Sequence, residues 1–218
     1  DWSSDVCSSD LFVLLKNDGI LPLAKTPEHI AVIGPNADDA EVLIGNYFGT
    51  PAAAVTPLAG IRDRVGEDGR VWFSEGCHLF ETENEWWGGK ANKGFAEAVA
   101  AAERSELAVL CLGLSASLEG EEGAVAASDG GGDRTGIGLP GMQQLLLEAV
   151  AATGTPVVLL VFNGSPVDLT WAHEHVSAIL DVWYPGEEAG HAIADVLFGD
   201  HAPAGRLRAP AGGRDGRA

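Results

Sequence analysis

Five short apolar runs, separated by longer stretches with helical character, constrain the fold of this chain more than any other feature of its sequence. The most apolar run, residues 156–162 (PVVLLVF), contains no charged or hydrogen-bonding side chain. Such a run is typical of a parallel strand with both faces covered, because a strand with one face in water alternates apolar and polar residues. The pattern predicts strands over residues 28–33, 71–74, 107–112, 156–162 and 177–183.

Helix signals lie between these runs. Thr56 followed by Pro57 is a favourable helix start, with threonine as N-cap and proline at the first helical position. In the helix expected over residues 139–153, we predict that Leu145, Leu146 and Val150 face the core. The other predicted helices cover residues 38–44, 92–104, 167–175 and 186–198.

Strands that alternate with helices, without a hairpin signal between them, predict an α/β fold. We expect a five- to six-stranded, mostly parallel sheet with helices on both faces, an αβα sandwich, over residues 12–207. Residues 1–11 (DWSSDVCSSDL) match no element period, and we interpret them as a non-native tail. Residues 208–218 lose the hydrophobic pattern, and we expect a disordered or frameshifted tail there.

The net charge limits the partners. At −19, it argues against nucleic acid and anionic membrane surfaces, because both require a basic patch. No apolar run approaches the length that spans a bilayer. The three cysteines are too few and too widely spaced for a disulfide framework, and we expect Cys111 to be a small core residue. The composition therefore fits a neutral ligand.

An acidic, glycine-rich stretch follows the predicted strand at 107–112. Glu119, Glu121 and Glu122 fall within four positions, and Asp133-Arg134 closes the glycine-rich part. A long loop inside a compact domain is uncommon and is usually functional or disordered. We therefore place the candidate chemistry in this loop.

The direction of the strands brings other segments to the same place. In parallel α/β sheets, ligands bind beyond the carboxyl ends of the strands. The segments that follow four of the predicted strands are residues 34–36, the loop from Gly113, residues 163–165 and residues 184–186. We thus expect the glutamates to share one edge with Asn163 and Tyr184.

Clustered carboxylates in a partly closed site favour acid/base chemistry. Burial and neighbouring like charges raise the pKa of a carboxyl group, which then stays protonated near neutral pH and can protonate a leaving oxygen. A solvated acidic loop is the alternative that spacing alone leaves open. No twelve-residue calcium loop, GxGxxG, GKS/GKT or GxSxG motif is present, so we expect no metal and no cofactor.

The chain resembles the α/β sandwich domain of glycoside hydrolase family 3, the β-glucosidase and β-xylosidase family. The resemblance runs in the family's order from about residue 11 to residue 207. It is carried by LLKNDGILPL, IAVIGPNAD, GNYFGTP with VTPLAGI, LGLSASLEGEEG, GGDRTGIGLPGMQQLL, VVLLVFNGSPVDLTWA and ILDVWYPGEEAGHAIADVLFGDHAPAGRL.

This resemblance implies a fragment of a retaining exo-acting hydrolase that uses two carboxylates on β-linked glucosides, xylosides or oligosaccharides. The sandwich domain of the family supplies the general acid/base, and a preceding (β/α)8 barrel, absent from this sequence, supplies an aspartate nucleophile. The fragment alone is then expected to be inactive. The resemblance also implies a periplasmic or secreted location for the full-length enzyme, although the fragment itself does not indicate one.

The family motif places the acid/base glutamate two residues after another glutamate and directly before a Gly-x-Asp-Arg unit. The match assigns Glu121 as acid/base and Glu119 as a residue that contacts substrate or tunes charge. It gives Arg134 and Asp133 a similar supporting role. The chain departs from the motif, because Glu122 stands where the glycine is expected and an insertion displaces Asp133-Arg134. Glu122 and Glu119 therefore remain alternatives for the acid/base.

Two other classes of function remain open from the sequence. One is a non-catalytic sugar- or nucleotide-binding α/β module, which predicts ligand affinity without a barrel. The other is an acidic interaction domain with an exposed loop.

Overall fold

The structure is a computed structural model that describes residues 10–24, 26–45, 49–80, 94–119, 134 and 136–207. Its centre is a six-stranded sheet of order β1-β6-β5-β4-β2-β3, in which only β1 is antiparallel to its neighbour. The strands are β1 (Val13–Asn17), β2 (His29–Ile33), β3 (Arg70–Ser74), β4 (Leu107–Gly113), β5 (Val157–Phe162) and β6 (Ala178–Asp181).

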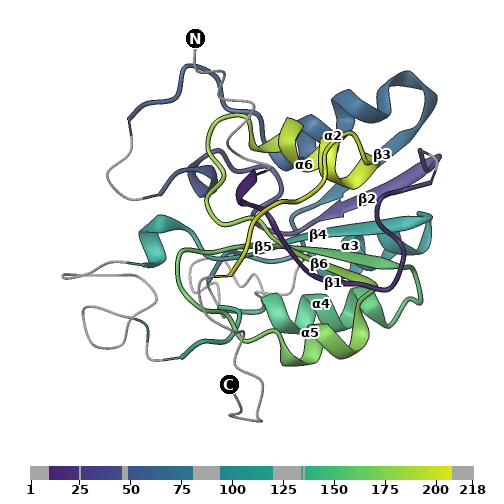
Figure 1. Cartoon of the computed structure of the whole chain (residues 1–218). Coiled ribbons are helices and arrows are strands. Elements are labelled where there is room, and N and C mark those ends of the chain that lie inside the picture. Colours follow the sequence, from purple (N-terminus) through teal and green to yellow (C-terminus); the bar gives the residue numbers. More distant parts are fainter. Residues whose placement is uncertain are drawn as a thin grey trace.

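Helices cover both faces of the sheet (Figure 1). One layer contains α2 (Pro57–Val65) and α6 (Ala189–Phe198), and the other contains α3 (Phe95–Glu103), α4 (Gln143–Ala151) and α5 (Thr170–His175). Three 3-10 turns complete the described elements: η1 (Glu41–Leu43), η2 (Gly66–Asp68) and η3 (Ala116–Leu118). The predicted αβα sandwich is confirmed.

The core consists of two apolar layers, one on each side of the sheet. Successive side chains of a strand point to opposite faces. Leu160 and Phe162 of β5 accordingly pack under α2 and α6, whereas Leu159 and Val161 pack under α3, α4 and α5. Each fully buried side chain of this size contributes about 1.5–3 kcal/mol. This two-sided burial explains why the apolar run of β5 is continuous.

The start of α2 and its contact with α6 follow directly from the sequence. The Thr56 hydroxyl oxygen accepts a hydrogen bond from the Ala59 N–H at 3.2 Å, as predicted for an N-cap. Gly60 of α2 lies against Gly190 of α6, and a Cβ built on Gly60 would stand 2.1 Å from the Gly190 carbonyl carbon. The glycine pair therefore lets the two helices approach closely.

Some local predictions were wrong. Leu145 is 50% exposed, because the buried face of α4 is formed by Gln143, Leu146, Leu147 and Val150. The helix expected over residues 38–44 is a three-residue 3-10 turn. Cys111 is fully buried in β4, as expected, and it and Cys77 are free thiols.

Within the described residues, no helix combines the length and the apolar character that crossing a bilayer requires.

Candidate active site

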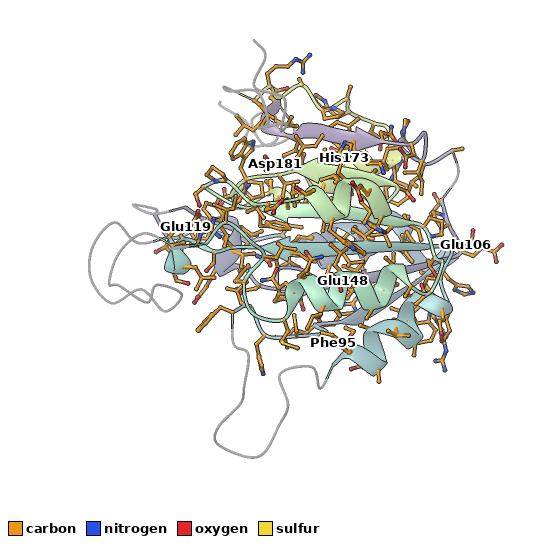
Figure 2. The ribbon with its side chains drawn as sticks, turned by 90° about the horizontal axis from the view of Figure 1, so that it is seen from below. Phe95, Glu106, Glu119, Glu148, His173 and Asp181 are labelled. Atoms are coloured by element: carbon orange, nitrogen blue, oxygen red, sulfur yellow. The ribbon has the colours of Figure 1, made fainter. Side chains whose placement is uncertain are left out.

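The segments that follow β2, β4, β5 and β6 lie at one edge of the sheet, the carboxyl edge, which is formed by the carboxyl ends of the strands. They share this edge because these four strands are parallel. Figure 2 shows this for β4: Glu106, which precedes the strand, lies at one end of the molecule, and Glu119, which follows it, lies at the other. The prediction that Glu119 shares an edge with Asn163 and Tyr184 is confirmed.

Glu119 links the ends of three strands. Its Oε2 accepts a hydrogen bond from the Gly164 N–H at 2.9 Å and another from the Tyr184 hydroxyl. Gly164 follows β5, and Tyr184 follows β6. Burial and the Glu119 carboxylate raise the pKa of Tyr184 above its ordinary value of 10, so the phenol keeps its proton and acts as the donor.

Gly164 leaves the space beside this carboxylate open. A Cβ on Gly164 would stand 2.8 Å from Glu119 Oε2 and 2.9 Å from Tyr184 Cε2. Both distances are shorter than real Cβ contacts. A side chain at this position would therefore displace either the carboxylate or the tyrosine ring.

The segment that follows β2 also holds the start of the acidic loop. Asn36 is fully buried, and its Nδ2 donates to the Leu114 carbonyl oxygen at 2.8 Å. The Leu114 N–H donates in turn to the Phe162 carbonyl oxygen at 2.7 Å. The first residues after β4 are thus held by the strands on both sides.

Gln143 is a site residue that the sequence reasoning missed. It is fully buried at the start of α4, where its Oε1 accepts from the Gly113 N–H at 2.7 Å and its Nε2 donates to the Gly113 carbonyl oxygen at 2.8 Å. Nε2 also donates to the Leu79 carbonyl oxygen at 2.6 Å. One amide therefore holds both backbone groups of the residue that ends β4.

Arg134 contacts the segment after β5. Its Nη2 donates to Ser165 Oγ at 3.0 Å and to the Pro166 carbonyl oxygen at 2.8 Å. Its charge lowers the pKa of Tyr184, in opposition to the stronger effects of burial and of Glu119. The guanidinium therefore lies close enough to this site to influence its electrostatics.

Glu121, Glu122 and Asp133, which the sequence analysis selected, lie outside the described residues. Their roles, and that of Arg134 as charge partner, stay predictions. Among the residues that the structure describes, no group of three or more histidine, cysteine, aspartate or glutamate side chains is arranged to hold a metal ion.

Comparison with known families identifies the domain. The model of the "Glycosyl hydrolase family 3 C-terminal domain" matches residues 12–215. A beta-xylosidase of Formosa agariphila is 37% identical over 203 residues, which are 89% of this chain and 26% of the relative. Beta-D-xylosidase 1 of Arabidopsis thaliana is 40% identical, over 89% of this chain and 23% of the relative.

A bacterial glucosidase and two solved structures give the same result. The periplasmic beta-glucosidase of Salmonella typhimurium is 35% identical, over 89% of this chain and 26% of its own length. A GH3 exo-beta-xylosidase (XlnD), solved with a xylobiose aziridine probe, superposes with a TM-score of 0.76 at 36% identity, over 90% of this chain and 23% of that one. A GH3 beta-glucosidase of Bifidobacterium adolescentis superposes with a TM-score of 0.72 at 32% identity, over 90% and 26% of the two chains.

The chain spans about a quarter of the length of the curated relatives that it matches. The family match spans residues 12–215 and so includes Glu119, and the superposition with the exo-beta-xylosidase covers 90% of the chain. The chain therefore belongs to glycosyl hydrolase family 3, of which it contains the C-terminal domain.

Proposed function

We propose that this chain is the acid/base-bearing domain of a retaining exo-β-glycosidase that hydrolyses terminal β-glucosyl or β-xylosyl residues. Glu121 is the acid/base, and a (β/α)8 barrel in the same enzyme holds the sugar and supplies the aspartate nucleophile. Xylosidase and glucosidase relatives both support the substrate class. The periplasmic relative supports a location outside the cytoplasm for the full-length enzyme.

The observation that carries this proposal is the position of Glu119. This residue lies at the carboxyl edge of the sheet, two positions before Glu121 in the sequence. In parallel α/β sheets, ligands bind beyond the carboxyl ends of the strands. A barrel that faces this edge would bring a glycosidic bond to the acidic loop.

Hydrogen bonding favours Glu121 or Glu122 over Glu119 as the acid. A general acid must present its proton to the glycosidic oxygen. Glu119 Oε2 already accepts from the Gly164 N–H and the Tyr184 hydroxyl. Its carboxylate is therefore engaged with the protein, which leaves Glu121 and Glu122 as the candidates for the acid.

The reaction has two steps. In the first, Glu121 protonates the glycosidic oxygen while the barrel aspartate attacks the anomeric carbon, which releases the aglycone and forms a glycosyl-enzyme ester. In the second, the Glu121 carboxylate takes a proton from water as that water attacks the same carbon, which releases the sugar and the aspartate. Both steps need the barrel, so the isolated chain should not hydrolyse the substrate.

The test compares glutamine variants of the three glutamates in the intact enzyme. Glu121→Gln should reduce turnover of a disaccharide by about 10²–10⁴-fold, because the bond cleaved has a poor leaving group that requires protonation. If Glu122→Gln does this and Glu121→Gln does not, the assignment is wrong by one residue. Turnover of aryl β-glucosides or β-xylosides by the isolated chain would contradict the division of labour between the domains. Sugar binding by the isolated chain would favour a non-catalytic binding module.

A further inference from the structure

Hydrogen bonds hold both the backbone and the side chain of Glu119. The preceding residue, Leu118, is fully buried, and the Glu119 N–H donates to the Ala116 carbonyl oxygen at 3.3 Å. The side chain accepts from the Gly164 N–H and the Tyr184 hydroxyl. Glu119 therefore marks a fixed point on the path of the chain.

This fixed point limits the position of the proposed acid. Two residues of extended chain span at most about 7 Å, so the Cα of Glu121 cannot lie further than that from the Cα of Glu119. A displacement of about 1 Å in a catalytic group can reduce a rate by about 10²-fold. The contacts that hold Glu119 thus bear directly on where Glu121 can place its proton.

The partner of Glu119 is itself held in place. Tyr184 follows Trp183, the one non-glycine residue with positive φ in the described part of the chain, at 57°. The Trp183 indole N–H donates to the Leu11 carbonyl oxygen at 3.1 Å, and the Gly186 N–H donates to the Leu43 carbonyl oxygen at 2.7 Å. The tyrosine therefore projects from a turn that is anchored on both sides.

From these contacts we infer that Glu119 and Tyr184 are a positioning pair for the acid/base loop, and that Glu119 acts through Glu121 and does not bind the sugar. This inference rests on the proposed function. In this arrangement Glu119 makes no direct contact with substrate. Its carboxylate contacts the phenol of Tyr184, which links the ends of β4 and β6. Gly164, at the end of β5, supplies the second hydrogen-bond donor.

The test uses the intact enzyme and two aryl β-glycosides, one with a good and one with a poor leaving group. Tyr184→Phe removes only the hydroxyl donor to Glu119. Because a displaced acid matters most when the leaving group needs a proton, kcat on the poor substrate should fall about 10-fold and kcat on the good one by less than about 3-fold. KM should change by less than about 2-fold, because uniform substrate binding is not lost.

A conservative pair of substitutions at Glu119 provides the second measurement. Glu119→Gln keeps an acceptor oxygen for Tyr184 and Gly164, whereas Glu119→Ala removes it. A positioning role predicts that Glu119→Gln retains at least about 5-fold more kcat on the poor substrate than Glu119→Ala, with KM preserved in both. A raised KM with unchanged kcat in these variants would overturn the inference and return Glu119 to substrate binding.

A matched control separates positioning from general destabilisation. Glu148→Gln alters a carboxylate on α4 that contacts Gln144, away from this edge. This control should leave kcat and its leaving-group dependence unchanged, and thermal unfolding of all variants shows whether each one is folded. Equal losses in Tyr184→Phe and Glu148→Gln would contradict the inference.

Assaying Glu121→Gln in parallel separates a failure of the inference from a failure of the proposed function. If Glu121→Gln shows the leaving-group dependence and Tyr184→Phe does not, the positioning pair is wrong and the acid assignment stands. If Glu121→Gln shows none, the proposed function itself fails.

Discussion

Glu106 and Glu119 flank the same buried strand, β4, yet they contact the rest of the protein in different ways (Figure 2). At the amino end, Glu106 Oε1 accepts from the Glu28 N–H at 3.0 Å in an exposed position. At the carboxyl end, Glu119 Oε2 accepts from Gly164 and Tyr184, which follow two other strands. The carboxylate after β4 is thus held by segments that follow two other strands, whereas the carboxylate before β4 accepts from a backbone N–H in an exposed position.

The largest effect that would test this difference comes from Gly113, the last residue of β4. Its φ is +137°, and a Cβ there would stand 2.0 Å from the Phe162 carbonyl oxygen. Gly113→Ala should therefore lower the free energy of unfolding by more than about 3 kcal/mol, measured by urea denaturation of the chain. Gly136→Ala, with nothing within 4 Å of the added Cβ, should change it by less than about 0.5 kcal/mol. Similar unfolding midpoints for the two variants would contradict the account.

Gln143 gives the next largest expected effect on stability, and the neighbouring Gln144 serves as its matched control. Gln143→Ala leaves the buried N–H and carbonyl of Gly113 without their side-chain partner, which should cost about 2–4 kcal/mol of unfolding free energy. Gln144→Ala removes only a contact with Glu148 on the helix surface, and should cost less than about 0.5 kcal/mol. Denaturation curves of the two variants measure the difference, and equal losses would show that the Gly113 contacts are unimportant.

Asp181 makes the carboxyl end sensitive to pH. It is only 4% exposed at the end of β6, and burial raises its pKa from the ordinary 3.8 to about 6, against the weaker effect of the Trp183 N–H. Because the folded state binds this proton more tightly than the unfolded state, stability falls as the pH rises from about 4 to above 6.

Asp181→Asn keeps the Oδ1 acceptor and removes the charge. It should raise the free energy of unfolding by about 2–3 kcal/mol at pH 8, and the gain should vanish near pH 3.5, where Asp181 is protonated in both states. Asp195→Asn on the exposed side of α6 serves as the control and should change stability little at either pH. A gain that is independent of pH would show that ionisation of Asp181 is not the cause.

The smallest expected effect is the difference in stability between alanine variants of Glu119 and Glu106. Glu119→Ala leaves the Gly164 N–H and the part-buried Tyr184 hydroxyl without this acceptor, which should cost about 2 kcal/mol. Glu106→Ala, at an exposed position, should cost less than about 1 kcal/mol. Thermal unfolding of both variants measures the difference. A larger loss for Glu106→Ala would reverse the comparison between the two ends of β4.

The sequence predicts most of the sheet because burial on two faces leaves a strong signal. β4 and β5 read as uninterrupted apolar runs, and both were found within one residue of the predicted ends. β1 was not assigned as a strand, because VLLKN at the sheet edge is buried only at its first residue and leaves no such run. The antiparallel β1–β6 pairing depends on contacts across the chain that local sequence does not encode.

The candidate site was predictable to a similar extent. Strand direction alone placed Glu119 and Tyr184 at one edge, and the structure confirms that they are in contact. Gln143 was not predictable, because a glutamine beside a second glutamine at a helix start usually faces solvent. Its burial depends on the backbone of Gly113, thirty residues earlier in the chain.

The most direct test of the central claim, that the loop after β4 carries the acid/base, is the pH dependence of kcat/KM in the intact enzyme. The alkaline limb of such a profile reports the acid of the free enzyme. With an aryl β-glycoside whose good leaving group needs no proton, activity of Glu121→Gln remains measurable, and the account predicts that its alkaline limb disappears. An alkaline limb identical to that of the unsubstituted enzyme would contradict the account.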